Sequence, residues 1–492
     1  MITVESNRSK KLNNFWNHCV FHPTDAVEDP WGKRLLDRFS DDGAIKTVRV
    51  YAMLEDIVYF DGEGRLSYDF RISDLRLSYL VSRGFDLLIA VAGMPDCIAR
   101  SVSGKTSVSK NKTRYKGKLW NTSPPSSAKL WEDICYEYVR HNVEVFGIDI
   151  VSKWQFQCFN EPDIPEFFMS ELPRSDIKTR CDEYCKMYEG FAHAIKKVDA
   201  GLKIGGPALA HQIDFLDEFL TYVKEKALPI DFISYHNYGT EPSLISRGER
   251  PFRVANHFEK HEKYVGIIKA NGFEHLPIII DEWGMSSGGF CNRDDCPELM
   301  FRETELYSSY FARLIHDVAY SDLNVEKMMI CLSGQHEMVE DFTGFRNFFT
   351  LNFIAKPIYN AYVLSSRLGD ELLEYNSDND KVFVTATRKE NGYSLLLTYC
   401  DDLFGEEIPA IEENLRFSED ISGKHVTVYR IDRETTNPYR LCQRLGISDP
   451  TAEDIAMLRE EGRLKAISNF VSDGETVTLS LTANCTYFIE IY

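Results

Sequence analysis

Two glutamates stand directly after apolar runs, where a carboxyl group could act on a bound ligand. Glu161 follows WQFQCFN (154–160) and precedes a proline, and Glu282 follows PIIID (277–281). Glycoside hydrolysis needs such a pair, because one carboxyl group protonates the leaving oxygen while the other attacks the anomeric carbon. Each motif alone also has a plain structural interpretation, as a turn with a capping Asn or as a surface Glu that ends a strand.

Asp281 competes with Glu282 for the role of nucleophile. Successive residues of a strand point to opposite faces, so the pattern predicts that only one of the two carboxyl groups faces the site. Periodicity alone leaves the choice between them open.

The two glutamates need a scaffold that brings the ends of their strands together. From about residue 45 to 355, short apolar runs alternate with helical patterns, and NFWNHCVF (14–21) brings the number of strands to eight. Strict alternation requires parallel strands with right-handed crossovers. We therefore predict a (β/α)8 TIM barrel over 14–355, with Glu161 and Glu282 at the C-terminal ends of its fourth and seventh strands, where barrel enzymes keep their chemistry.

Past about residue 370 the pattern changes to short strands separated by turns, which predicts an all-β sandwich. We expect this accessory domain to cover 356–492, with a small helical insertion at about 448–466, and we expect residues 1–13 to join it. The strands predicted from alternation include DKVFVTATR, YSLLLTYC, HVTVYRID, ETVTLSL and CTYFIEIY.

Composition narrows the classes of partner. The 492 residues carry a net charge of −20, which disfavours binding to nucleic acid and to anionic membranes. The N-terminus lacks a secretory h-region, and no stretch has the length of a membrane-spanning helix. The 12 cysteines follow neither a disulfide framework nor a metal-site spacing with His. We expect a cytoplasmic protein with reduced thiols and no bound metal.

At these residues the chain resembles glycoside hydrolase family 39 of clan A, which contains β-xylosidases and α-L-iduronidases. The resemblance runs from about Phe15 to past Leu458 and so covers nearly the whole chain. The matching pieces include IKTVRVYAMLEDI (45–57), WQFQCFNEPDIPEFF (154–168), DFISYHNYG (231–239), IIIDEWG (278–284) and KPIYNAYVLSSRLGDELL (356–373).

The resemblance implies a role for each matching residue. Glu161 aligns with the family's acid/base, and Glu282 aligns with its nucleophile. Asn160 would hydrogen-bond the sugar 2-hydroxyl, His236 would line the sugar subsite, and Tyr238 would donate to Glu282.

Three further residues belong to the expected sugar site. Arg49 would lie near the nucleophile and lower its pKa. Tyr51 occupies the position of a family His that touches the sugar, and Trp283 follows the nucleophile. Without the resemblance, a structural ion pair is an equally good interpretation of Arg49.

The resemblance implies an exo-acting retaining glycosidase that cleaves β-xyloside-like terminal sugars from a small carbohydrate substrate. It implies no cofactor. Because family members are often oligomeric, a homo-oligomer is also expected. Departures in the sugar wall, at Tyr51, Ala92 and the Ser333-Gly334 pair, keep arabinoside, galactoside or uronide specificity open. A uronide would need a basic residue to bind its sugar carboxylate, and the sequence does not identify one. A sugar-binding barrel without catalysis is the other alternative, whereas a metal hydrolase lacks a His-x-His cluster at the strand ends.

Overall fold

Eight parallel strands close into a barrel in this computed structural model, which describes residues 1–21, 27–106, 119–333, 338–404, 406–474 and 476–492. Each barrel strand pairs with its predecessor and its successor in the series, and the last pairs with the first. The strands are β2 (His18–Val20), β3 (Thr47–Tyr51), β6 (Asp86–Val91), β9 (Gln155–Cys158), β10 (Lys203–Leu209), β11 (Phe232–Thr240), β12 (Ile278–Ser286) and β13 (Val325–Cys331). The predicted (β/α)8 barrel is confirmed.

Helices cover the outside of the barrel, and local signals mark where they begin. The Asp176 carboxylate accepts from the Thr179 backbone N–H and caps the longest of them, while Asp29 caps a helix whose first residue is Pro30. The main helices are α2 (Pro30–Asp41), α3 (Arg71–Ser82), α4 (Ala128–Phe146), α6 (Ile177–Val198), α7 (Ile213–Glu225), α9 (Ala255–Asn271), α10 (Glu305–Ala319) and α11 (Pro357–Ser365).

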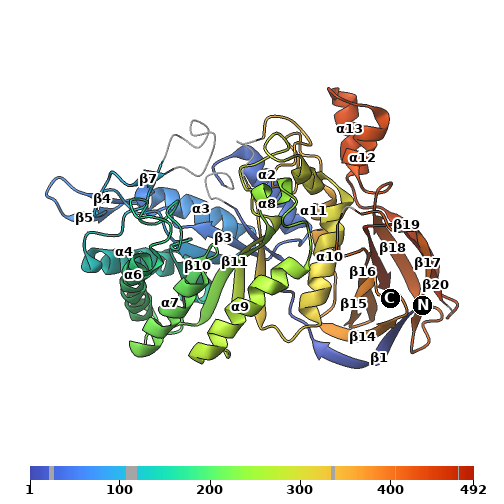
Figure 1. The fold of residues 1–492 in the computed structure, drawn as a ribbon, viewed down its shortest axis with the longest axis horizontal. Helices are drawn as coiled ribbons and strands as arrows, with labels where there is room; N and C mark the ends of the chain where they lie inside the picture. The colour runs from blue at the N-terminus through green and yellow to red at the C-terminus, as the bar shows by residue number, and fades with distance from the viewer. Residues whose placement is uncertain (22–26, 107–118, 334–337, 405, 475) are drawn as a thin grey trace.

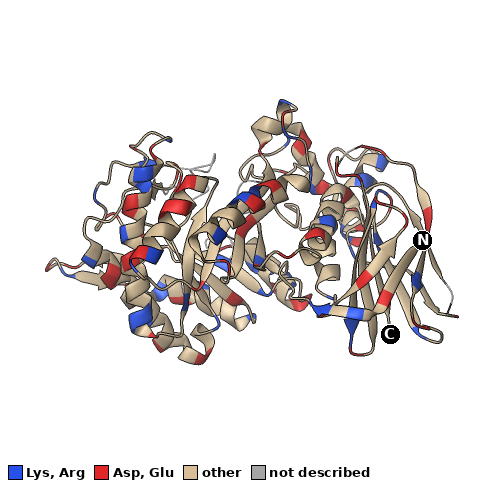
Figure 2. Ribbon diagram, turned by 60° about the horizontal axis from the view of Figure 1, so that its bottom comes forward, with Lys and Arg blue, Asp and Glu red and all other residues tan. Residues whose placement is uncertain are grey.

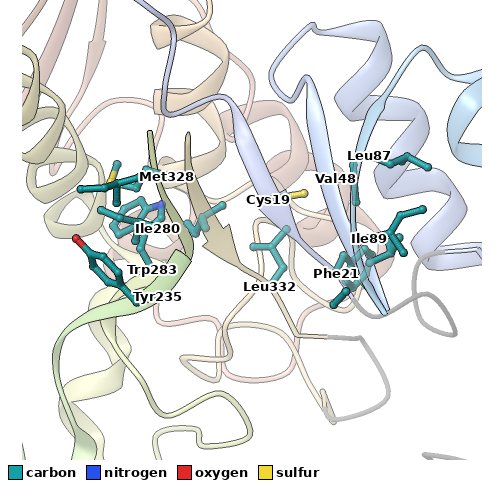
Figure 3. Packing of buried hydrophobic residues seen from close by; sticks show 14 of the residues in the cluster. Cys19, Phe21, Val48, Leu87, Ile89, Tyr235, Ile280, Trp283, Met328 and Leu332 are labelled. Carbon is teal, nitrogen blue, oxygen red and sulfur yellow. The ribbon is translucent and has the colours of Figure 1, made fainter. Parts of the chain in front are cut away.

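Side chains alternate across the barrel wall. Ile279 belongs to a small cluster inside the barrel, whereas its neighbour Ile280 packs in the large core between strands and helices. Figure 3 shows this outer layer, in which Ile280, Trp283 and Met328 lie close together. The two layers hold each strand in a fixed orientation, so that residues at the strand ends are positioned precisely over the barrel mouth.

Strands β11 and β12 run several residues further than the apolar runs 229–235 and 276–281 predict. Their extensions carry polar residues, which is why apolar patterning stops short of them. The pairing register shifts between Tyr235 and His236, and again between Ile280 and Trp283. Such irregularities re-aim side chains at a barrel rim.

The C-terminal part is a nine-stranded sheet that curls over its own core. Its order is β19-β18-β21-β16-β15-β14-β1-β17-β20, and strands from both halves of this order share one buried cluster. The N-terminal strand β1 pairs with β14 and β17, so the start of the chain completes this sheet. The strands are β1 (Ile2–Lys11), β14 (Glu371–Ser377), β15 (Val382–Lys389), β16 (Gly392–Tyr399), β17 (Ile411–Phe417), β18 (His425–Ile431), β19 (Ala466–Val471), β20 (Val477–Leu481) and β21 (Cys485–Ile491).

Two helices interrupt this sheet, α12 (Pro438–Leu445) and α13 (Ala452–Glu461). The predicted insertion contains α13, whose Thr451 and Asp454 form a capping box, while α12 precedes it. Strands β14, β17 and β19 were not predicted. β17 reads IEENLRF, and its charged outward positions dilute the apolar signal.

The sheet docks on the barrel through α10. Ser309 on that helix hydrogen-bonds Thr398 of β16 at 2.7 Å in a buried contact, and Glu305 pairs with Arg440 of α12 at 2.8 Å. Figure 1 shows α10 between the barrel and the sheet. The contact fixes the two parts relative to each other.

The remaining elements are short and lie in connections: η1 (Leu54–Asp56), β4 (Val58–Phe60), β5 (Leu66–Tyr68), β7 (Lys105–Thr106), β8 (Trp120–Asn121), α5 (Ile148–Val151), α8 (Pro242–Ser246) and η2 (Pro297–Glu303). The Ser-rich loop 100–118 lies partly outside the described residues. Acidic and basic residues are interspersed on the outer helices (Figure 2). None of the described helices combines the length and the apolarity needed to cross a bilayer.

Candidate active site

Glu161 reaches the barrel mouth from a tight turn after β9. Phe159 and Glu161 both have positive φ, at 63° and 44°, a conformation that costs free energy for residues with a Cβ. The Glu161 backbone N–H donates to the Ala208 carbonyl at 3.0 Å, which ties the turn to the end of β10. The strained turn directs the Glu161 side chain over the barrel.

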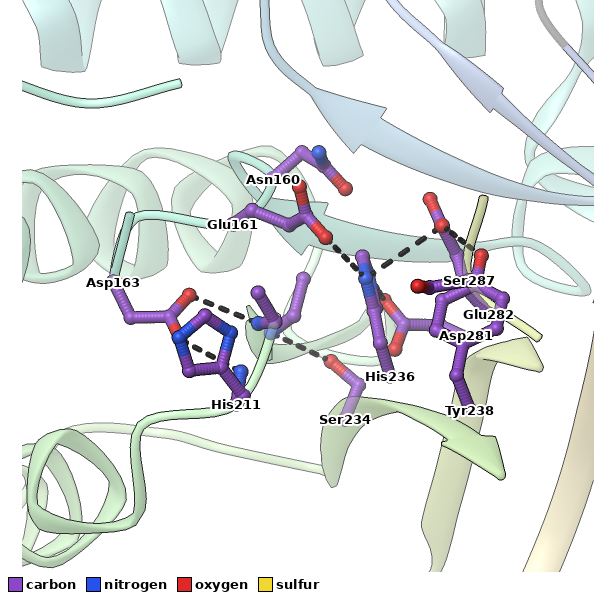
Figure 4. Close-up of polar contacts among 12 residues, drawn as sticks. Asn160, Glu161, Asp163, His211, Ser234, His236, Tyr238, Asp281, Glu282 and Ser287 are labelled. Atoms are coloured by element: carbon purple, nitrogen blue, oxygen red, sulfur yellow. Dashed lines mark hydrogen bonds and ion pairs between the residues drawn. The ribbon is translucent and has the colours of Figure 1, made fainter. Parts of the chain in front are cut away.

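Asp163, two residues further on, anchors the same turn. Its buried carboxylate accepts hydrogen bonds from the backbone N–H groups of Ala210, His211 and Gln212, each at 2.9 Å. Figure 4 shows Asp163 reaching across to this loop. The loop after β10 and the turn that carries Glu161 therefore form one rigid unit.

Asp281 and Glu282 both point into the barrel, so the prediction that only one of them can do so is wrong. Asp281 accepts from the Gln157 amide at 2.6 Å deep in the barrel, and the Glu282 carboxylate lies above it near the mouth. The physical reason is the irregular pairing of β12 between Ile280 and Trp283, which breaks the alternation of faces.

The carboxyl groups of Glu161 and Glu282 both lie close to the imidazole ring of His236. The Nδ1 atom of His236 lies 2.8 Å from Oε1 of Glu161 and 3.6 Å from Oε2 of Glu282. A carboxylate oxygen of each glutamate and one ring nitrogen lie within 4.8 Å of one another (Figure 4). Retaining glycosidases hold their carboxyl groups about 5 Å apart, whereas inverting enzymes leave room for a water molecule at about 6.5–9.5 Å.

Glu282 is held by three side chains from other strands. Arg49 Nη1 donates to Oε1 at 3.0 Å, Tyr238 donates from its hydroxyl to Oε2 at 2.8 Å, and the Tyr51 hydroxyl lies 3.5 Å from Oε1. Arg49 also donates from Nη2 to the side-chain amide oxygen Oδ1 of Asn160 at 2.7 Å. Because that oxygen is used, the Asn160 amide nitrogen is the group that a ligand would meet.

The prediction that Trp283 belongs to the sugar site is wrong. Its side chain is fully buried on the outer face of the barrel, where its ring stacks on Phe311 of α10 at a centroid distance of 5.7 Å. After the irregularity at Asp281–Glu282, the next residue of β12 points outward. Trp283 supports the strand and does not line the sugar site.

Residues 1–476 match glycosyl hydrolases family 39. The chain belongs to this family. It is 27% identical over 460 residues to a β-xylosidase of Caldicellulosiruptor saccharolyticus, an alignment that covers 90% of this chain and 88% of the relative. It is 23% identical over 264 residues to human α-L-iduronidase, covering 47% of this chain and 35% of that protein.

The fold is also that of a solved β-xylosidase structure. A monomeric β-xylosidase from Caulobacter crescentus CB15 superposes with a TM-score of 0.82 at 19% identity, over 100% of this chain and 99% of the other. As a member of family 39, the protein is a retaining glycoside hydrolase that acts on O-glycosyl bonds of a carbohydrate substrate.

The charges around this family 39 site shift the pKa values of Glu161 and Glu282 in opposite directions. Burial raises the pKa of Glu161, and the neighbouring Glu282 charge raises it further, although His236 opposes both effects. Burial also raises the pKa of Glu282, but the cations His236, Arg49 and Arg346 outweigh it, so the pKa of Glu282 is lowered overall. The environment thus favours a protonated Glu161 beside an ionised Glu282.

The surroundings of His236 favour its protonated form. Burial lowers its pKa, but the surrounding carboxylates of Glu282, Asp281 and Glu161 outweigh burial and raise it. Its Nε2 atom lies 3.7 Å from Asp281, and its Nδ1 atom faces the two glutamates. Asp281 therefore acts on Glu282 indirectly, because it favours the imidazolium form of His236, which stabilises the charge of the Glu282 carboxylate.

Arg346 is a member of the site that sequence reasoning missed. Its Nη1 atom donates to the Tyr238 hydroxyl at 2.8 Å and to the Ser287 carbonyl at 3.1 Å, and its Nε atom lies 3.4 Å from the Ser333 hydroxyl. Arg346 comes from the long connection after β13, where no periodic pattern marks a functional residue. Gly334, predicted to lie near the sugar, is outside the described residues.

The Glu161–His236–Glu282 group is also spaced so that it could surround a metal ion. However, Nδ1 of His236 already lies within hydrogen-bond distance of Glu161. A protonated ring nitrogen donates to a carboxylate and has no lone pair for a metal. The donor set therefore fits a charge network better than a metal site.

Proposed function

We propose that Glu161 is the acid/base and Glu282 the nucleophile of a double displacement that removes a terminal sugar. The observation that carries this assignment is the approach of their carboxylate oxygens to within 4.8 Å, the separation that retention requires. The opposite pKa shifts of the two groups supply the protonated acid and the ionised nucleophile that the first step needs.

In the first step, a Glu282 oxygen forms a bond to the anomeric carbon while the glycosidic C–O bond breaks. The Glu161 proton passes to the leaving oxygen, so Glu161 becomes a carboxylate as Glu282 becomes an ester. In the second step Glu161 takes a proton from water, whose oxygen displaces Glu282 from the same face that the leaving group occupied. The sugar is released with its original configuration.

The surrounding residues prepare Glu282 for this exchange of charge. Arg49, Tyr51 and Tyr238 surround its two oxygens, and Arg346 fixes the Tyr238 hydroxyl from behind. These donors stabilise the carboxylate before attack and again when it departs from the anomeric carbon. The Asn160 amide is positioned to bind the sugar hydroxyl next to the reacting carbon.

For the sugar we propose a β-xyloside or a related pentoside, because two relatives that each align along about nine-tenths of this chain are named β-xylosidases. A uronide is the second candidate. Arg346 supplies the basic group that the sequence alone did not reveal, and its guanidinium lies beside Tyr238 and Ser287 at the mouth.

A panel of aryl glycosides of xylose, arabinose, galactose, glucose and glucuronic acid tests both candidates. We expect hydrolysis of at least one substrate, with the first-formed sugar in the same anomeric form as the substrate by NMR. An inverted first product would contradict the roles of Glu161 and Glu282. Absence of turnover on every glycoside would favour the sugar-binding alternative.

We further propose that the protein is cytoplasmic and that copies of it associate. All 12 cysteines are unpaired, and most are buried, which suits a reducing compartment. Cell fractionation tests the location. Light scattering of the purified protein tests the association, which would be contradicted by the mass of one chain across the accessible concentration range.

A further inference from the structure

Strand β19 forms one end of the nine-stranded sheet and, among the described strands, pairs with β18 alone (Figure 1). All six of its residues are exposed. Three of them are large and apolar, with exposed fractions of 43% for Ile467, 38% for Phe470 and 55% for Val471. The strand at the other end of the sheet, β20, exposes Thr478 and Ser480 and buries its apolar residues. Of the two edges, β19 is therefore the apolar one.

The outer edge of β19 also carries backbone groups that can pair with a further strand. The Ser472 N–H donates to the Lys424 carbonyl at 2.8 Å, and the pairing with β18 keeps its register from Val471 back to Ser468. The register shifts only beyond this stretch, at the start of β19. Residues of an antiparallel strand alternate in the neighbour that they bond. Asn469 and Val471 therefore direct their N–H and carbonyl groups away from β18.

The composition of β19 does not protect this edge. Proteins usually guard an edge strand with charged residues, proline or a covering segment, because an open edge is a template for pairing with another chain. β19 reads AISNFV and contains neither a charge nor a proline. The charged residues flank it instead, with exposed Lys465 before the strand and exposed Asp473 after it. Such an edge suits the addition of a strand from outside the chain.

We propose that β19 is the interface of a symmetric dimer, in which it pairs antiparallel with β19 of a second copy around Asn469. The two nine-stranded sheets would then join into one sheet across a two-fold axis. This inference deepens the proposed association of copies and is independent of the proposed reaction.

The sequence of β19 is complementary to itself in this register. With Asn469 opposite Asn469 of the second copy, Ile467 lies opposite Val471, so an apolar pair repeats on each side of the axis. Lys465 lies opposite Asp473, so an ion pair follows at each end. A slip of two residues in either direction sets Ile467 against Asp473 or Lys465 against Val471. This match is the reason to assign the edge to a second copy of the chain.

Cross-linking through Asn469→Cys tests the register directly. On the two-fold axis the two Cα atoms would form a hydrogen-bonded pair about 5.5 Å apart. That separation lies inside the range of disulfides, about 4.4–6.8 Å. Mild oxidation should therefore link most of this variant into two-chain species. Thr478→Cys on the opposite edge of the sheet is the matched control and should stay unlinked, as should the wild-type chain, whose Cys97 is already exposed.

Charge reversal tests the two ends of the interface by sedimentation. Lys465→Glu sets a carboxylate against Asp473 at both ends, so the dissociation constant of the dimer should rise about tenfold. The double variant Lys465→Glu/Asp473→Lys restores opposite charges and should return the constant to within about threefold of wild type. It does not restore the contact of Lys465 with Glu460 within the chain at 3.1 Å, so recovery reports on the second copy. Leu75→Lys, at an exposed apolar residue of α3, controls for the added charge and should leave the constant unchanged.

The outcomes separate this interface from the other proposals. A wild-type chain that sediments with the mass of one chain would overturn the dimer and the association together. Open-ended growth with concentration, which pairing of β19 with β20 of another copy would produce, would overturn the symmetric dimer. A two-chain species whose Asn469→Cys variant links no better than Thr478→Cys would overturn the β19 interface alone. β19 supplies no residue to the site around Glu161 and Glu282, so every variant should keep wild-type kcat/KM, and a dimer without turnover would count against the proposed reaction only.

Discussion

Replacing Glu161 with alanine should slow the two chemical steps by different amounts. Under the proposed assignment, the change removes the proton donor of the first step and the base of the second. It leaves the nucleophile in place, because Glu282 keeps Arg49 at 3.0 Å and Tyr238 at 2.8 Å. His236 loses its partner at 2.8 Å but still faces Glu282 at 3.6 Å, so the charge that favours ionised Glu282 remains.

The magnitude follows from this arrangement. A positioned acid or base contributes about 10²–10⁴-fold, which is about 3–5 kcal/mol at 1.36 kcal/mol per tenfold. On a natural disaccharide, whose leaving group needs a proton, kcat/KM for Glu161→Ala should fall by that full factor. On a dinitrophenyl glycoside, whose leaving group needs no proton, kcat/KM should change by less than about tenfold, while kcat falls because hydrolysis of the ester is slow.

Stopped-flow measurement with the dinitrophenyl substrate should therefore show a burst equal to the enzyme concentration. Azide, a small anion that needs no base, should fit the space left by the carboxylate, accelerate turnover and give a glycosyl azide of retained configuration. Glu166→Gln is the control, since Glu166 lies in the same loop and pairs with Arg174 at the surface. Equal losses on both substrates, with no burst and no azide effect, would refute the role of Glu161.

Four further outcomes can be measured. Glu282→Ala should lower turnover of every glycoside by roughly 10⁴-fold or more without loss of folding, and near-normal rates would contradict its role. The profile of kcat/KM against pH should fall at low pH, where Glu282 with its lowered pKa becomes protonated, and at high pH, where Glu161 with its raised pKa loses its proton. The Glu161→Gln variant should lack the fall at high pH. Asp163→Ala should reduce the free energy of unfolding by about 3 kcal/mol in urea titrations, because three buried N–H groups lose a charged acceptor, whereas an unchanged midpoint would argue against the anchor. Incubation with EDTA should leave activity unchanged, and loss of activity restored by a metal would assign Glu161, His236 and Glu282 to a metal site.

Local sequence patterns were sufficient to locate the acidic pair and the barrel. The apolar runs before Glu161 and Glu282 mark buried parallel strands, and counting them places both residues at one end of the barrel. Patterning failed where a regular strand gives way to an irregular one. It placed Asp281 and Glu282 on opposite faces, because it assumes an unbroken alternation that β12 does not keep. The placement of Trp283 at the sugar rested on the family resemblance, and its side chain is buried on the outer face of the barrel.

The sequence by itself determined most element types, the closed barrel and the strand ends that carry Glu161 and the Asp281-Glu282 pair, since each depends on apolar periodicity within a few neighbouring residues. The choice of Glu282 over Asp281 came from the family resemblance. Only the tertiary structure decided that Asp281 and Glu282 both point into the barrel and that Arg346 joins them, whereas Arg49 and Tyr238 were expected beside Glu282 from the family resemblance. Arg346 reaches Tyr238 across 108 residues of chain, Arg49 reaches Glu282 across 233, and Asp163 holds a loop 47 residues away. The charge of a catalytic carboxyl group depends on such distant partners, because electrostatic interactions follow distance in space and are independent of separation along the chain.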